Sequence, residues 1–185
     1  MRKTKALSIL AALPLWLAVA SFHASAAQVD YFLKIDGVDG ESQDEGHKDW
    51  INLLSFSQSV SVDIDPTSGR PGTAKFEDIQ FTKYLDKATP LLMLNCASGK
   101  HIPTATLVCR KAGTGAAPVE YYKITMTDIL VSSVSTSGSA GDPVPTETLS
   151  LNFTKIEWEY IPQSADGSVE PPVKTAWDLT TNQQP

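Results

Sequence analysis

Apolar and polar residues alternate along most of the chain after the first 26 residues, which is the pattern of β-strands whose successive side chains point to opposite faces. Turn-rich stretches with Gly, Pro, Ser and Asp separate the alternating runs. The runs predict a series of short antiparallel strands. Their apolar positions are Tyr31, Leu33 and Ile35; Ile79 and Phe81; Ala105, Leu107 and Cys109; Tyr122, Ile124 and Met126; and Leu149, Leu151 and Phe153.

The alternation slips by one position after Phe153 and then continues through Ile156, Trp158 and Tyr160. A slip of this kind predicts a β-bulge near Thr154 and Lys155. A Pro-rich stretch follows, and the sequence VKTAWDLTTN (residues 173–182) then predicts a last strand docked on the others.

Residues 55–65 read SFSQSVSVDID and predict a strand with two different faces. The apolar face predicts contact with a core: Phe56, Val60, Val62 and Ile64. The other face carries a stripe of small hydroxyl side chains: Ser55, Ser57, Ser59 and Ser61. This stripe faces either bulk water or a water-filled lumen. A Gly- and Pro-rich loop follows at residues 65–73.

One segment breaks the strand pattern. In KATPLLMLNCASGK, leucines lie close together and β-branched residues are few, which favours a short helix over residues 90–98. Thr89 is the expected N-cap, Pro90 the first helical residue, and Gly99 the stop. Many strands and one helix predict a mainly β fold, a closed or nearly closed antiparallel barrel or sandwich.

Residues 1–26 predict a secretory signal peptide. Arg2, Lys3 and Lys5 precede an apolar run, and Ala24-Ser25-Ala26 is a small-x-small site with cleavage expected before Ala27. An uncleaved membrane anchor is the alternative. The expected organisation is a leader at 1–26 and a single domain at 27–185, exported to the periplasm or the medium with no membrane contact in its mature form.

The charge of the mature chain argues against nucleic acid as a partner. The whole chain has 15 basic and 21 acidic residues, and removing the leader leaves 12 basic residues and a net charge of −9. An acidic protein without a basic run is poorly suited to nucleic acid or anionic membrane. The charge mainly indicates solubility.

Candidate chemistry is sparse. Cys96 and Cys109 are either two buried thiols or, in an oxidising compartment, a disulfide. His47 and His101 lack metal-ligand spacing, so neither a metal site nor a cofactor is expected. A nucleophile–base pair of Cys96 and His101 is the one formal catalytic arrangement, and no third orienting group accompanies it. This sparseness favours binding or assembly, and no catalytic residue is expected.

Several stretches together resemble the haemolysin-coregulated protein (Hcp) family, the tail-tube proteins of type VI secretion. They run in order over nearly the whole mature chain: DYFLKIDGVDGES (30–42), FTKYLDKATP (81–90), ASGKHIPTATLVCRKAG (97–113), EYYKITMTDILVSSVSTSGS (120–139), ETLSLNFTKIEWEY (147–160) and VKTAWDLTTNQ (173–183).

The resemblance implies a β-barrel of two packed sheets with one short helix. It also implies that six copies form a ring, that rings stack into a tube, and that effectors travel in the lumen, with spike and sheath proteins as further partners. Ser57 matches the lumen-facing serine of the family, and Ser55, Ser59 and Ser61 share its face. The loop after this strand matches an extended loop that reaches a neighbouring subunit or ring: Asp65, Pro66, Thr67, Ser68, Gly69 and Arg70.

The leader departs from the family, because tube subunits assemble in the cytoplasm and normally carry no such segment. Two hypotheses therefore follow from the sequence. The first is a ring or tube component of type VI secretion that also carries effectors. The second is an exported β-barrel binding module that no longer builds a tube. A hydrolase using Cys96 is a third and weaker idea.

Overall fold

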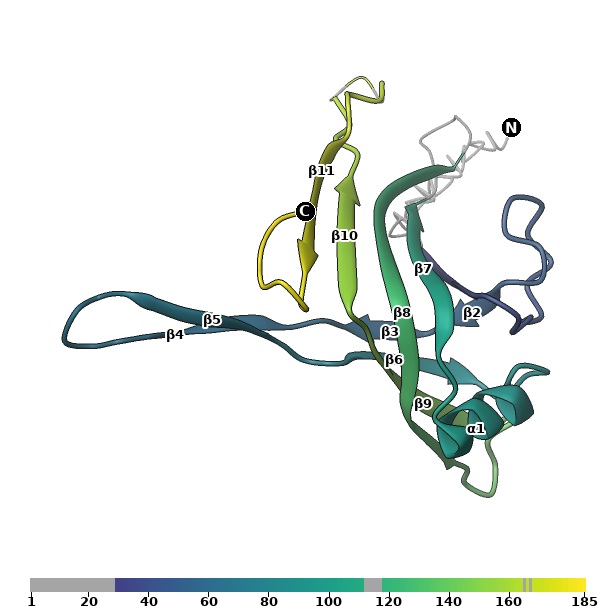
Figure 1. Cartoon of the computed structure of the whole chain (residues 1–185). Helices are drawn as coiled ribbons and strands as arrows, with labels where there is room; N and C mark the ends of the chain where they lie inside the picture. Colours follow the sequence, from purple (N-terminus) through teal and green to yellow (C-terminus); the bar gives the residue numbers. More distant parts are fainter. Residues whose placement is uncertain (1–28, 112–117, 165, 167) are drawn as a thin grey trace, which may run out of the picture.

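The computed structural model describes residues 29–111, 118–164, 166 and 168–185. These residues form antiparallel strands and one helix (Figure 1). The elements are β1 (Val29–Ile35), β2 (Ile51–Leu53), β3 (Ser55–Ser57), β4 (Val60–Ile64), β5 (Pro71–Phe76), β6 (Ile79–Tyr84), α1 (Thr89–Ser98), β7 (Ile102–Lys111), β8 (Val119–Ser137), β9 (Thr146–Asn152), β10 (Lys155–Tyr160) and β11 (Val173–Asp178). The predicted leader at 1–26 lies outside the described residues.

Two sheets share the long strand β8. Its first part pairs with β7 and β10, so that one sheet runs in the order β2-β1-β7-β8-β10-β11. Its second part pairs with β9, which begins the second sheet, β8-β9-β6-β3. Asp128, between the two parts, has a left-handed φ of 50°. The prediction of a mainly β fold with two packed sheets and one helix is confirmed.

Across both sheets the strands run in the order β2-β1-β7-β8-β9-β6-β3, and one residue of the chain joins the two end strands, β2 and β3. β2 pairs with β1 and β3 pairs with β6, and only Leu54 separates β2 from β3 in the chain. The backbone N–H of Leu54 donates to the carbonyl of Thr82, 2.7 Å away. The bent segment 51–57 thus bridges the open side of the two sheets, and it explains the barrel-like outline.

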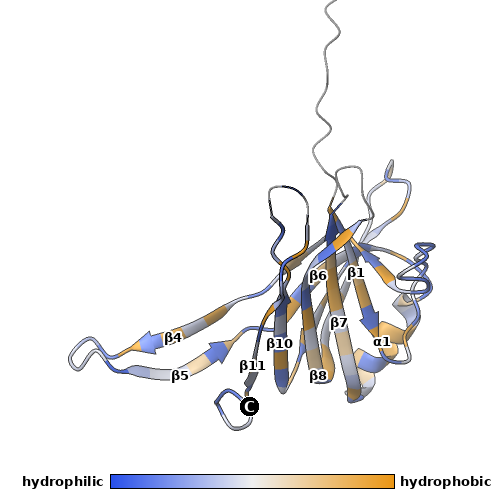
Figure 2. Ribbon diagram, turned by 90° about the horizontal axis from the view of Figure 1, so that it is seen from above, coloured by the Kyte–Doolittle hydropathy of each residue, from blue (hydrophilic) through white to orange (hydrophobic). Residues whose placement is uncertain are grey.

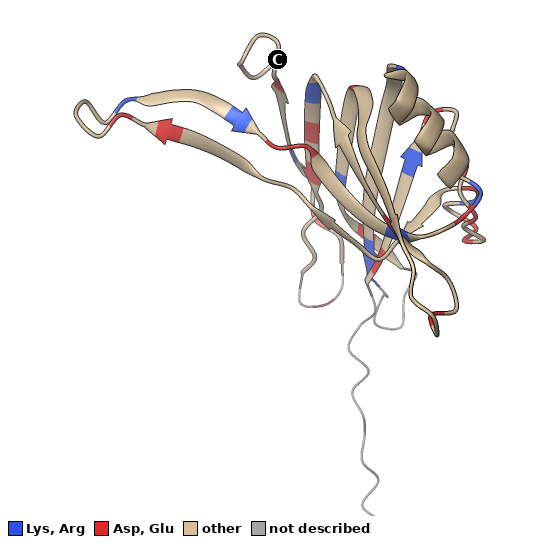
Figure 3. Ribbon diagram, turned by 90° about the horizontal axis from the view of Figure 1, so that it is seen from below, with Lys and Arg blue, Asp and Glu red and all other residues tan. Residues whose placement is uncertain are grey.

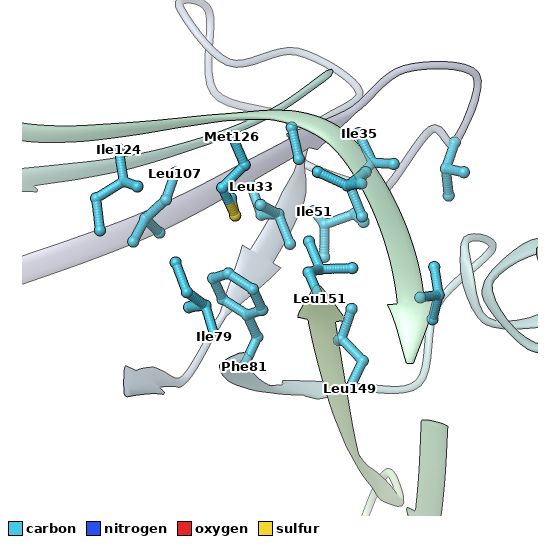
Figure 4. Packing of buried hydrophobic residues seen from close by; sticks show 14 of the residues in the cluster. Leu33, Ile35, Ile51, Ile79, Phe81, Leu107, Ile124, Met126, Leu149 and Leu151 are labelled. Carbon is cyan, nitrogen blue, oxygen red and sulfur yellow. The ribbon is translucent and has the colours of Figure 1, made fainter. Parts of the chain in front are cut away.

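The core lies between the two sheets and receives the alternating apolar positions (Figure 4). Ten fully or nearly fully buried side chains meet there: Leu33, Ile35, Ile51, Ile79, Phe81, Leu107, Ile124, Met126, Leu149 and Leu151. Leu92 of α1 is also buried in this cluster. Burying such a side chain contributes about 1.5–3 kcal/mol, so the alternation read from the sequence accounts for most of the driving force.

The predicted bulge at Thr154 and Lys155 is wrong. The strand is interrupted at residues 153–154, but its pairing with β8 keeps one register, because Asn152 lies opposite Leu130 and Lys155 opposite Thr127. The register shifts instead on β8, between Val131 and Ser133. The phase slip in the sequence therefore marked the place where the strand leaves one sheet for the other.

The helix agrees with the prediction except at its N-cap. Ala88, not Thr89, is the N-cap and makes no side-chain capping bond. Asp86 supplies the missing acceptor, since its Oδ1 accepts the N–H of Ala88 at 3.0 Å. Gly99 ends the helix with a φ of 61°, a conformation that glycine adopts without strain. No helix among the described residues combines the length and the apolar character that crossing a bilayer requires.

His47 and Arg110 hold the segment between β1 and β2 against the barrel. The buried ring of His47 stacks on Phe32 with 4.2 Å between centroids, and its Nδ1 lies 2.9 Å from Asp44 Oδ1. Arg110 donates to Asp44 at 2.6 Å and to Asp30 at 2.9 Å. The hydrogen bond with His47, helped by Arg110, lowers the pKa of Asp44 to about 2 although burial opposes this.

A buried charge cluster lies beneath the start of α1. Lys83 is fully buried, and its Nζ lies 2.6 Å from Asp86 and 3.2 Å from Glu147. It also donates to Thr89 at 3.2 Å and to the carbonyl of Tyr84 at 3.0 Å. Glu147 is fully buried as well, and its carboxylate makes no hydrogen bond with good geometry. Lys83 is therefore the main compensation for the charge of Glu147.

Two substitutions in this cluster should lower the stability of the fold by different amounts. Lys83→Met should destabilise the fold by about 3–5 kcal/mol, because it leaves a buried carboxylate without its cation. Glu147→Leu should cost less, since Lys83 keeps Asp86. Urea unfolding followed by circular dichroism measures both, and an equal or larger loss for Glu147→Leu would contradict this account.

Candidate functional surfaces: a neutral sheet face and a projecting arm

The outer face of the sheet β8-β9-β6-β3 carries uncharged polar side chains across all four strands. We call it the neutral face and define it by two rows of cross-strand neighbours. The first row is Ser57, Gln80, Ser150 and Ser133, and the second is Ser55, Thr82, Thr148 and Ser135. Most of these side chains are exposed. Ser133 Oγ and Ser150 Oγ are hydrogen-bonded at 2.9 Å, so neighbouring hydroxyls partly satisfy each other.

The outer face of the other sheet is charged instead (Figure 3). One cross-strand row of this face holds Lys123, Glu159 and Lys174, and the next row begins with Lys34 and includes Glu157. Glu159 lies between Lys123 at 3.0 Å and Lys174 at 3.1 Å. The hydrogen bond from Lys123, followed by that from Lys174, lowers the pKa of Glu159. The molecule therefore presents one charged wall and one wall whose two rows are uncharged, with Glu77 and Asp78 at its edge.

Strands β4 and β5 form a two-stranded arm that projects far from the barrel (Figures 1 and 2). Residues 65–70 make its tip, where the carboxylate of Asp65 accepts the N–H of Thr67 at 2.8 Å and of Ser68 at 3.3 Å. These bonds, that from Thr67 first, lower the pKa of Asp65. The predicted loop Asp65–Arg70 is thus the end of a long hairpin.

The expectation that Val60, Val62 and Ile64 enter the core is wrong. Their side chains are exposed by 55%, 43% and 63%, because the strand breaks at Gln58 and Ser59 and continues onto the arm. The arm is a separate sheet that has no second layer to pack against. Only Phe56, on β3, packs against the core.

The break also divides the predicted serine stripe. Ser55 and Ser57 lie on the neutral face, whereas Ser61 lies on the arm and Ser59 at its base. The sequence did not identify the other members of the face on β6, β8 and β9. Their signal is present in part, since hydroxyls alternate with leucines in ETLSLN and are frequent in VSSVSTS. Which of these strands lie side by side is decided only by the tertiary structure.

Aromatic side chains hold the base of the arm. Phe76, the last residue of β5, stacks on Trp158 with 6.1 Å between centroids and lies 6.5 Å from Trp177. Just before the other strand of the arm, Gln58 Oε1 accepts the indole N–H of Trp158 at 3.1 Å. Because both strands of the arm are tied to β10 and β11, the direction of the arm is set by the barrel.

The two thiols differ in burial, since Cys96 is half-buried and Cys109 is buried. Cys96 and Cys109 are both free, so the disulfide alternative is wrong. Burial raises the pKa of Cys109 to about 12. The expectation that no third group orients His101 is wrong, because its Nδ1 is hydrogen-bonded to Asp128 at 2.7 Å. Within the described ranges, no group of three or more His, Cys, Asp or Glu side chains is arranged to hold a metal.

The fold and its two surfaces define a class of protein: a two-sheet antiparallel β domain with one helix and one long hairpin. Residues 32–160 match the family model described as "Type VI secretion system effector, Hcp". The chain therefore belongs to the Hcp family, and the resemblance seen in its sequence is confirmed.

Individual relatives agree with this assignment. The chain is 47% identical over 160 residues to "Protein hcp1" of Pseudomonas aeruginosa, covering 84% of this chain and 98% of that protein. A structure described as that of "a type six secretion system protein" superimposes with a TM-score of 0.79 at 29% identity, over 85% of this chain and all of the other. Hcp1 from Salmonella typhimurium superimposes with a TM-score of 0.67 at 39% identity, over 85% and 99% of the two chains.

Proposed function

We propose that this protein is a structural subunit of a type VI secretion tube, in which six copies form a ring and rings stack. The observation that carries the proposal is the neutral face, which covers four strands in a chain of the Hcp family. In the ring, this face lines the lumen, with Ser55 and Ser57 among its wall residues. The arm reaches a neighbouring subunit through residues 60–76.

A wall of hydroxyls suits the passage of varied cargo. Ser and Thr hydroxyls exchange hydrogen bonds with water at little net free energy, so a passing protein finds no strong polar trap. Fixed charges repeated six times around a narrow lumen would retain cargo of opposite sign and repel cargo of the same sign. The separation of charge onto the other sheet keeps the wall free of both effects.

The proposed partners are further copies of this chain, effector proteins in the lumen, and the spike and sheath proteins of the same apparatus. Nucleic acid and membrane are not among them. The proposed mature protein is the domain 27–185, exported to the periplasm or medium after removal of residues 1–26. A relative from Pseudomonas aeruginosa, 25% identical over 136 residues, is described as "Major exported protein".

Export through the leader has a direct test. The full-length chain, expressed in a Gram-negative host, should yield a periplasmic or secreted form whose N-terminal residue is Ala27. N-terminal sequencing of each cell fraction reads the cut. A cytoplasmic protein that retains residues 1–26 would contradict the leader and leave the ring untouched.

Ring formation is tested by light-scattering mass and negative-stain images of the domain 27–185. The expected result is a six-subunit mass with annular particles. A monomer that persists over a wide concentration range would overturn the proposal, and it would favour an exported binding module on the same fold.

A single charge introduced on the neutral face tests whether this face lines the lumen. Ser57→Glu should change the folding free energy by less than about 0.5 kcal/mol, as exposed substitutions usually do, and should keep the six-subunit mass. It should weaken binding of a co-expressed effector about tenfold, equivalent to about 1.4 kcal/mol.

Thr106→Glu is the matched control for this substitution, because it adds the same charge on the charged face, beside Lys34. It should leave the effector bound. Equal effector binding by the Ser57→Glu and Thr106→Glu rings would show that Ser57 does not face the cargo.

A further inference from the structure

Helix α1 presents apolar side chains to solvent. Leu91, Met93 and Leu94 are exposed by 43%, 43% and 60%, and we call these three residues the helix patch. Asn95, the polar residue of the same turn, is buried. The helix TPLLMLNCAS contains no charged residue on any side.

This pattern is unusual for a surface helix. A helix at the surface of a monomer normally turns charged or polar side chains to water, and one that is apolar all round is normally buried. Exposed apolar patches of this kind mark sites where another surface docks. The outer side of α1 therefore requires a cover that a single copy does not supply.

A second exposed apolar set lies on the arm. Val60, Val62 and Ile64 occupy alternate positions of β4 and so share one side of it, and we call them the arm stripe. Among the charges of the arm, Lys75 pairs with Asp63. An isolated two-stranded hairpin is marginally stable in water, so the arm also requires a partner surface.

The arm and α1 lie on opposite sides of the barrel (Figures 1 and 2). One copy therefore cannot bring its own arm stripe onto its own helix patch, but a neighbouring copy can. We propose that the arm stripe of one subunit packs on the helix patch of the next. This rests on the proposed ring and deepens it, by naming the two surfaces that meet.

The chemistry of the two surfaces favours this pairing over self-pairing. Both are apolar and neither needs an ion pair, so contact removes apolar area from water on both sides. Met93 adds a flexible side chain that adapts to a neighbour's shape. Arm-to-arm contact would give closed dimers and leave every helix patch bare, whereas a head-to-tail contact uses both surfaces and closes into a ring.

Cross-linking tests the contact in the whole mature domain. The background variant is Cys96→Ser, which removes the half-buried thiol on α1, while Cys109 is buried and unreactive. Ile64→Cys and Leu94→Cys are then combined and treated with a short bis-maleimide. The expected result on a denaturing gel is a ladder reaching six subunits, with no ladder from either single variant.

A matched control pairs Ile64→Cys with Val169→Cys. Val169 is 59% exposed, nearly the same as Leu94, and lies in the connection between β10 and β11. This pair should not cross-link. A ladder of equal yield from the control would overturn the contact, because the arm would then lack preference for the helix.

The remaining outcomes separate this contact from the ring itself. A six-subunit ring without the Ile64–Leu94 ladder overturns the contact and leaves the proposed function standing. A monomer that never cross-links overturns both. Covalent dimers from Leu94→Cys alone indicate helix-to-helix contact and also overturn it.

Opposite charges introduced on the two surfaces test the contact independently of cross-linking. Leu94→Glu and Ile64→Lys, each alone, should shift the light-scattering mass from six subunits toward one, and their combination should restore the ring. Loss of the ring in both single variants without rescue in the double variant would count against direct contact.

Discussion

The structure depends on the sharing of β8 between two sheets. One continuous strand pairs with β7 and β10 along its first part and with β9 along its second. Side chains alternate across a strand. In β8 this alternation shifts by one position at Asp128, so that Ile124 and Met126 before it and Ile129 and Val131 after it all enter the core. The other side chains of β8 point away from the core, in one direction before Asp128 and in another direction after it. The turn at Asp128 therefore sets both the shape of the core and the directions of the two outer walls.

The same strand separates charged from uncharged surface. Before Asp128 its outward positions include Lys123, in a cross-strand row with Glu159 and Lys174. After Asp128 they include Ser133 and Ser135, in rows with Ser150 and Thr148. Opposite charges in adjacent strands stabilise one wall by pairing, whereas hydroxyls in adjacent strands leave the other wall wet and neutral. The two outer walls of the domain therefore offer different chemistry to other molecules.

The arm and the helix are the places where the chain departs from the ordinary rules of a soluble monomer. Val60, Val62 and Ile64 form an alternating apolar face with no core behind it, and Leu94 faces water while Asn95 is buried. Natural sequences usually break such local rules where function demands it. Both departures become consistent with the rest of the chain once another copy covers them.

The sequence alone determined the fold class, because alternating apolar residues such as Leu33, Ile79 and Leu149 can be buried only as strands with one inward face. It also determined the helix and the serines of β3. It placed the apolar residues of β4 in the core, since alternation reports that a strand has two faces and not what lies against each. Only the tertiary structure decided that the strand breaks at Gln58, where Trp158 binds its side chain. The neutral face was equally beyond the sequence, because rows such as Ser57, Gln80, Ser150 and Ser133 arise from pairing between distant strands.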